Sequence, residues 1–270
     1  MPARRLIASA TVLAVLIVAP ATANAATTIT ISGSTSVAPL ATQLAKGYVT
    51  GKRKGKVKFK ILQGGSDVGI GDVSHGRVTL GMSSRDPQPS DPGGLSFNRI
   101  ARDGVCIATH PSNRLSNVSQ QTVQDIFSGR ITSWSQVPGA TVSGPIDLIS
   151  RNPASGTQDA FQNIFMGVNL RVAPSASQKP SNGRVQQSIR SDENAIGYLD
   201  FNFTAGTHTV PYRGVACSLR NAKSGQYGGV RNFWLVSRGK PSGAAKSWIN
   251  WIRKSSKARR TIAKNWVPLR

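Results

Sequence analysis

Short apolar strands in this sequence end, again and again, in turns rich in glycine and serine that open a helical segment. Residues 28–31 form the first such strand and pass through the turn 32–36 into a helix that ends near Tyr48. Residues 57–61 alternate apolar side chains with lysines, which is typical of a strand with one buried face. The turn 64–67 then opens a second helix. This alternation predicts an α/β fold with a largely parallel sheet.

The same pattern continues along the chain, without an internal repeat of fixed period. Further strands are expected at 78–82, 104–110, 146–150, 195–199, 209–215 and 230–236. Further amphipathic helices are expected to bury Val123, Ile126 and Phe127, then Phe161, Ile164 and Phe165, and finally Ala245, Trp248, Ile249 and Ile252. Ser36 is the expected N-cap of the first helix, and Ser242 that of the last.

The first 25 residues have the pattern of a secretory signal peptide. Arg4 and Arg5 precede an apolar stretch at 6–21, and Ala23-Asn24-Ala25 is a cleavage site of the small-x-small type. An uncleaved membrane anchor is the alternative, although the stretch is short for a transmembrane span. No cysteine near the site offers a lipid anchor. We therefore expect an exported protein, either periplasmic or extracellular and at the cell surface.

Export places the two cysteines, Cys106 and Cys217, in an oxidising compartment where pairing is the default. Two separately buried thiols are the alternative, because sequence alone does not show whether the Cα atoms lie close enough for a bond. Two cysteines also exclude a disulfide-framework miniprotein and a cysteine-rich zinc module.

Positive charge strongly exceeds negative charge in this chain. The 34 lysines and arginines outnumber the 11 acidic residues, and the net charge of +23 implies an anionic partner or surface. Basic residues cluster at 52–60 and 253–270, either as solvated faces or as a patch that holds the protein to an anionic cell surface. The alternative function is a secreted protein that binds nucleic acid or another anionic polymer by counterion release. Aromatic residues are sparse in these clusters, and such a function leaves the turns described next unexplained.

Several strand-to-helix turns carry small hydroxyl residues, as an anion site would require. They contain Ser34-Thr35-Ser36, Gly65-Ser66, Ser83-Ser84 and Ser155-Gly156-Thr157, the last preceded by Arg151. Helix N-termini and hydroxyls donate hydrogen bonds to anions, and glycine lets the backbone approach closely. Arginine binds tetrahedral oxyanions through two parallel hydrogen bonds. Each turn alone could be a simple helix cap, but together they predict an anion-binding site.

A hydrolase is the third class considered. His75, His110 and His208 lie outside the turn motifs, and no Gly-x-Ser-x-Gly nucleophile elbow is present. The sequence also lacks a His-x-x-x-His motif and clustered carboxylates, so no metal site is expected. We therefore expect a binding protein without enzymatic activity and without a cofactor.

Five segments of the sequence resemble the phosphate-binding proteins of bacterial phosphate ABC transporters. They are 33–40 (GSTSVAPL), 63–70 (QGGSDVGI), 81–85 (GMSSR), 151–157 (RNPASGT) and 123–134 (VQDIFSGRITSW). The resemblance implies a type 2 periplasmic-binding-protein fold, in which two α/β lobes close on one ligand. Lobe one would comprise 26–104 plus 216–270, and lobe two 105–215. Cys106 and Cys217 would then lie on the two crossover segments, which strengthens the case for a disulfide.

The resemblance also implies a ligand, a partner and a set of binding residues. The ligand would be inorganic phosphate, delivered by a monomeric protein to a membrane ABC permease. The phosphate-binding residues carried over from the family motifs are Thr35, Ser36, Val37, Ser66, Ser84, Arg151, Ser155, Gly156 and Thr157.

One position departs from the family pattern. Ser84 stands where the best-known members have an aspartate that accepts a hydrogen bond from protonated phosphate and repels sulfate. We expect Asp67, or less favourably Asp86, to supply this acceptor and preserve a preference for phosphate. A site in which Ser84 accepts the proton, with weaker discrimination, is the alternative.

Overall fold

The computed structural model describes residues 26–269, so the predicted signal peptide lies outside the described residues. Nine strands form one continuous sheet in the order β2-β1-β3-β9-β4-β7-β5-β6, and β8 pairs with β4. The strands are β1 (Thr27–Gly33), β2 (Val57–Ile61), β3 (Leu80–Ser83), β4 (Leu95–Thr109), β5 (Asp147–Arg151), β6 (Ser177–Lys179), β7 (Ala195–Asp200), β8 (His208–Val210) and β9 (Val230–Arg238). The helices are α1 (Ala38–Tyr48), α2 (Ser66–Ser74), α3 (Gln120–Phe127), α4 (Gly156–Phe161), α5 (Asn182–Arg190), α6 (Leu219–Ser224), α7 (Gly243–Lys254) and α8 (Ser256–Asn265).

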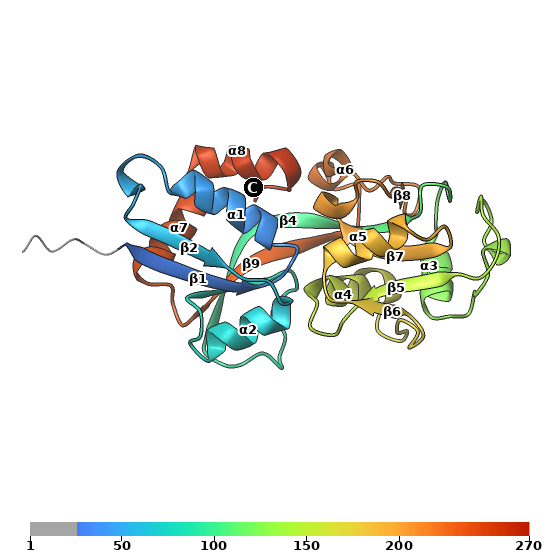
Figure 1. Ribbon diagram of the computed structural model, residues 1–270, viewed down its shortest axis with the longest axis horizontal. Coiled ribbons are helices and arrows are strands. Elements are labelled where there is room, and N and C mark those ends of the chain that lie inside the picture. Colours follow the sequence, from blue (N-terminus) through green and yellow to red (C-terminus); the bar gives the residue numbers. More distant parts are fainter. Residues whose placement is uncertain (1–25, 270) are drawn as a thin grey trace, which may run out of the picture.

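The sheet has two halves that lie side by side, and β4 and β9 run between them (Figure 1). Strands β1, β2 and β3 pair in parallel in one half, and β5 pairs in parallel with β6 and β7 in the other. The long antiparallel ladder of β4 and β9 extends from Leu95 opposite Arg238 to Gly104 opposite Val230. The expected α/β fold is confirmed, but the sheet is mixed rather than largely parallel, because every pairing made by β4 and β9 is antiparallel.

Each half has its own hydrophobic core. The first core joins β1, β3, β9 and α1 with the C-terminal helices, and the four residues expected to face inward from α7 are all buried in it: Ala245, Trp248, Ile249 and Ile252. The second core gathers Val123, Ile126 and Phe127 of α3 around Phe161 and Tyr198. Within residues 26–269, none of the helices combines the length and the apolar character that crossing a bilayer requires.

The first crossover strand is longer than the sequence predicted. The expected strand began at residue 104, whereas β4 begins at Leu95. Polar residues such as Asn98 and Asp103 interrupt the apolar pattern, but both are buried because β9 pairs along this stretch. Pairing with a distant strand therefore overrides the local pattern.

The two cysteines form the expected disulfide, Cys106–Cys217, with Cα atoms 5.6 Å apart. Cys106 lies in β4 and Cys217 just before α6, so the bond ties the first crossover to the segment that leads into the second. The two-thiol alternative is therefore wrong.

Candidate functional site

The hydroxyl residues of the four turns all lie where the two halves of the molecule meet. Three turns belong to the first half: one follows β1, one opens α2 and one follows β3. The fourth opens α4 in the second half, directly after β5. Parallel strands bring their carboxyl ends to one edge of a sheet, which is why turns distant in sequence converge here.

Ser36 is not the N-cap of α1, contrary to the expectation. The N-cap is Val37, and Ser34 fulfils the capping role, because its Oγ accepts hydrogen bonds from the backbone N–H groups of Ser36 (3.2 Å) and Val37 (3.3 Å). The sequence allowed either serine to cap, since both precede the helix. The choice of Ser34 leaves the hydroxyl of Ser36 free to face the opposite half.

Five buried hydroxyl residues, which we call the hydroxyl cluster, form two hydrogen-bonded groups: Ser34, Ser66 and Ser84 in one, and Ser36 and Thr157 in the other. Ser34 Oγ donates to Ser84 Oγ at 2.9 Å, and Ser66 Oγ lies 3.4 Å from Ser84 Oγ. Ser66 Oγ also accepts from the backbone N–H of Ser84 at 3.0 Å. Across the two halves, Ser36 Oγ and Thr157 Oγ1 are 3.1 Å apart.

The backbone of Gly156 passes close to this network. A Cβ atom at Gly156 would fall on Ser66 Oγ and lie 2.8 Å from Ser84 Oγ, so a side chain here would separate the two halves. Ser155 has a local role as the N-cap of α4, where its Oγ accepts from the N–H groups of Thr157 and Gln158. Among the predicted site residues, Val37 and Ser155 therefore support the turns, whereas the others face the junction.

Arg151 reaches the junction from the end of β5 and contacts both halves. Its Nη2 donates to Thr35 Oγ1 and its Nη1 to Thr157 Oγ1, each at 3.4 Å. Its Nε also donates to the carbonyl oxygen of Lys179 and its Nη2 to that of Pro180, both at 3.1 Å. Burial lowers the pKa of Arg151 to about 10, so it keeps its positive charge at neutral pH.

The structure adds four buried polar residues that the sequence motifs did not indicate: Arg231, Asn182, Asp103 and Asp200. Arg231 in β9 donates through Nη1 to Thr157 Oγ1 (2.8 Å) and through Nη2 to Ser36 Oγ (2.8 Å). Asn182 opens α5 and donates to Ser36 Oγ at 2.8 Å. The sequence signal was weak, because Arg231 stands inside an expected strand while Asp103 and Asp200 only border two others, and a strand pattern does not tell which face is buried.

Neither Asp67 nor Asp86 lies in the hydroxyl cluster, which corrects the expectation about the proton acceptor. Asp67 Oδ1 accepts from Arg85 Nε at 2.8 Å, and Asp86 Oδ1 accepts from Asn232 Nδ2 at 2.8 Å and Trp234 Nε1 at 3.0 Å. Both carboxylates therefore serve other partners. Ser84, by contrast, is buried within the cluster.

A second polar contact between the halves lies beside the cluster. Arg85, which is buried after β3, forms an ion pair with Asp91 at 2.6 Å and lies 3.4 Å from Asp159 of α4. Burial and the negative charge of Asp67 together raise the pKa of Asp159 to about 6, against the opposing effect of Arg85. Arg85 and Asp159 therefore link the two halves independently of Arg151.

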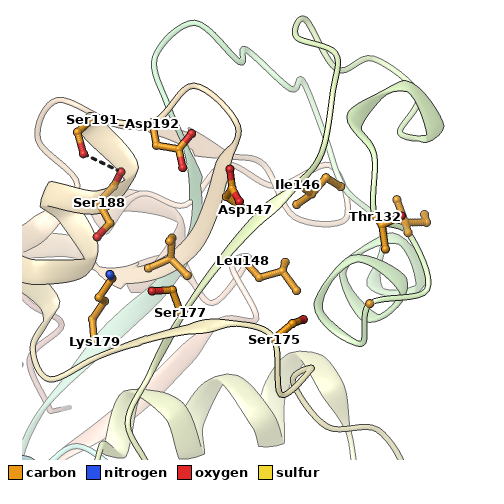
Figure 2. Close-up of a pocket in the computed structure, with 13 residues that line it drawn as sticks. Thr132, Ile146, Asp147, Leu148, Ser175, Ser177, Lys179, Ser188, Ser191 and Asp192 are labelled. Carbon is orange, nitrogen blue, oxygen red and sulfur yellow. Dashed lines mark hydrogen bonds between the residues drawn. The ribbon is translucent and has the colours of Figure 1, made fainter.

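A separate hollow lies away from this network. Figure 2 shows it in the second half, where Asp147 of β5, Lys179 of β6 and Asp192 line it. Its volume is about 530 Å³, and none of the hydroxyl-cluster residues contributes to its wall. Burial and the neighbouring Asp192 raise the pKa of Asp147 in this hollow.

Comparisons with known proteins point to one family. A family model described as the PBP superfamily domain matches residues 18–255. The phosphate-binding protein PstS of Bacillus subtilis (strain 168) is 25% identical over 235 residues, which cover 85% of this chain and 76% of that protein.

Solved structures agree with this match. A Clostridium perfringens protein assigned as a phosphate ABC transporter substrate-binding protein, with bound phosphate, is 30% identical with a TM-score of 0.83. The alignment covers 90% of this chain and 100% of that chain. An ABC-type phosphate transport receptor from Vibrio cholerae is 25% identical with a TM-score of 0.72, covering 89% and 100% respectively.

Proposed function

We propose a function from the premise that this chain belongs to the PBP superfamily and, within it, to the substrate-binding proteins of phosphate ABC transporters. The chain captures inorganic phosphate outside the cytoplasm and delivers it to an ABC transporter in the membrane. The resemblance inferred from the sequence motifs is thereby confirmed. The family consists of substrate-binding proteins rather than enzymes, so binding and delivery are the whole of the activity.

The observation that carries this function is the meeting of hydroxyl donors from both halves around Arg151. Ser36 and Thr157 come from opposite halves and approach to 3.1 Å, with Arg151 donating to Thr157. A tetrahedral oxyanion needs many donors and a fixed positive charge, and this junction supplies both. We assign the phosphate contacts to Thr35, Ser36, Ser66, Ser84, Arg151, Gly156 and Thr157, with Val37 and Ser155 as supports.

Two lobes that close on phosphate are part of this proposal, and the presence of two separate hydrophobic cores supports them. The sequence placed lobe one at 26–104 plus 216–270 and lobe two at 105–215. Tyr227 favours a later second boundary, because it packs in the second core and its hydroxyl donates to the carbonyl of Val105 at 2.7 Å. We therefore draw the second boundary at about residue 229, immediately before β9.

Calorimetry tests the function directly. The protein without residues 1–25 is freed of carried-over ligand by unfolding and refolding, and phosphate is then titrated. We expect one phosphate per chain, and light scattering should show a monomer. Heat that stays at the dilution level, with phosphate in excess, would overturn the assignment.

An anionic polymer at the cell surface is a second partner that we propose, alongside phosphate rather than in its place. Residues 26–66 and 201–269 contain no aspartate or glutamate, and they hold seven and thirteen basic residues respectively. They meet where α8 packs on α1 and α7, and the basic side chains of α8 are exposed: Lys257, Arg259, Arg260 and Lys264. Helices α1, α7 and α8 carry no acidic side chain of their own, which suits a polyanion.

Binding to polyglutamate at increasing salt tests this partner, because that polymer presents carboxylates and no phosphate. We expect affinity to fall steeply with salt in the parent protein. A variant with Lys257, Arg260 and Lys264 changed to glutamine should bind more weakly, with unchanged affinity for phosphate. Equal binding of polyglutamate by the variant and the parent would exclude the α8 face as the polymer-binding surface.

A further inference from the structure

Arg231 is placed to bind the anion together with Arg151. It lies in β9, on the crossover between the two halves, and is 6% exposed. Its Nη1 donates to Thr157 Oγ1 at 2.8 Å and reaches Ser84 Oγ at 3.4 Å, while Nη2 donates to Ser36 Oγ at 2.8 Å. One guanidinium thus contacts hydroxyls of three separate turns, from both halves of the molecule.

Two buried carboxylates lie against the same guanidinium, at its Nη2 atom. Asp103 Oδ2 lies 3.3 Å and Asp200 Oδ2 lies 3.5 Å from Nη2 of Arg231. Both side chains are fully buried, and they come from neighbouring strands, β4 and β7. Asn182 Nδ2 donates to Asp200 at 3.0 Å, and the backbone N–H of Asn202 donates to its other oxygen at 3.2 Å.

The charges around this pair balance only while no anion is bound. The charged groups that face it are Arg231 from β9 and Arg151 from β5, against Asp103 and Asp200 themselves. Tyr198 beside Arg151 stays neutral, because burial raises its pKa. A phosphate dianion would add two negative charges to two positive and two negative ones that are all buried. Like charges favour the protonated form of a carboxyl group, so the pair is the natural place for a compensating proton.

The ionisation behaviour of the pair supports this placement. Burial raises the pKa of Asp200 to about 6, although Arg231 opposes the shift. Burial and the charge of Asp200 raise the pKa of Asp103 well above its ordinary value. A carboxyl group whose pKa is already raised needs only a further rise in pKa to gain a proton when an anion binds.

We propose that Arg231 is a second anion-binding arginine of this site, and that Asp103 and Asp200 take up one shared proton when phosphate binds. The inference rests on the proposed function and deepens it. The proton stays on the protein, behind Arg231, and its uptake makes phosphate affinity fall as the pH rises. The pair holds Arg231 in place and limits the net charge of the filled site.

Calorimetry in two buffers of different ionisation enthalpy measures the proton directly. At about pH 8, above the second pKa of inorganic phosphate, most of the free phosphate is dianion. We expect the parent protein to take up about 0.5–1 proton per phosphate. In Asp103→Asn and Asp200→Asn one carboxylate is permanently neutral, so uptake should fall to near zero in each and affinity should rise. Asp125→Asn, in α3 at the ion pair with Arg130 and outside the site, is the control and should keep the uptake of the parent.

Unchanged proton uptake in both asparagine variants would overturn the assignment of the proton to Asp103 and Asp200, because the proton would then belong to the ligand. Absence of uptake in a parent protein that binds phosphate would also overturn it, and would leave the proposed function intact. A parent protein that does not bind phosphate overturns both.

Arg231 is tested separately with a variant that keeps the positive charge. Arg231→Lys still compensates the two carboxylates but cannot contact three hydroxyls at once. We expect phosphate affinity to fall more than about tenfold, with circular dichroism and unfolding midpoint close to those of the parent. Because an uncharged residue could unfold the chain, the double variant Arg231→Gln with Asp103→Asn serves as the second test. Parent-like affinity in folded Arg231→Lys, or affinity in the folded double variant equal to that of Asp103→Asn alone, would overturn the role of Arg231.

Discussion

Ser36 Oγ and Thr157 Oγ1 lie 3.1 Å apart, although 121 residues separate them in sequence and they belong to opposite halves of the molecule. Ser36 follows β1, and Thr157 is in the first turn of α4 after β5. Their contact exists only when the halves are together. Under the proposed function, bringing the halves together assembles the anion site.

Gly156→Ala should weaken phosphate binding without unfolding the protein. The new methyl group would fall on Ser66 Oγ and force the halves apart, at a cost of about 1–3 kcal/mol or roughly tenfold to a hundredfold in affinity. Calorimetry gives the affinity, and thermal denaturation checks the fold. Gly183→Ala is the matched control, because its Cβ would meet only ordinary contacts, the nearest at 3.9 Å. Parent-like affinity in the Gly156 variant would show that the halves need not approach this closely.

Arg151→Ala should lose more than about tenfold in phosphate affinity. Each hydrogen bond from a charged group contributes about 1.5–3 kcal/mol, and Arg151 can make two to one anion. Arg184→Ala removes an exposed arginine of the same half and should bind like the parent. If folded Arg151→Ala bound phosphate as tightly as the parent, Arg151 would not be a ligand.

Reduction of the disulfide should destabilise the folded protein substantially. Cys106 and Cys217 close a loop with a sequence separation of 111, for which loop-closure entropy gives about 4–5 kcal/mol. Urea unfolding of the same protein, oxidised and then reduced, isolates the bond from any change of residue. An identical free energy of unfolding in both states would contradict the prediction.

Asp159 should make stability fall with rising pH. Its folded-state pKa is about 6, above the ordinary value of 3.8, so its contribution is full below about pH 4 and is lost as the pH rises through 6. Because the side chain is 28% exposed, we expect a loss of only about 1–2 kcal/mol.

Urea unfolding between about pH 4 and pH 7 checks this, with Asp159→Asn as the variant. The difference in free energy of unfolding between variant and parent should grow in favour of the variant as the pH rises. Asp72→Asn, at a surface ion pair with Arg77, is the control and should run parallel to the parent. A parallel profile for Asp159→Asn would show that Arg85 compensates the carboxylate fully.

Local patterns in the sequence determined the strand–turn–helix order, the inward face of α7, the family and the hydroxyl-rich turns. These features depend on residues within a few positions of one another, where periodicity and turn chemistry act directly. Arg151 and Thr157 were found for this reason, since they lie six residues apart in a single turn motif.

Only the tertiary structure decided which polar residues the site gathers from elsewhere. Arg231 and Asp103 lie opposite each other because β4 and β9 pair over a long antiparallel ladder, and Asp200 joins them through its own strand β7. Nothing near Arg231 in the sequence distinguishes it from the many exposed arginines of this basic chain. Its burial, and with it the electrostatics of the site, arises from strand pairing between residues more than a hundred positions apart.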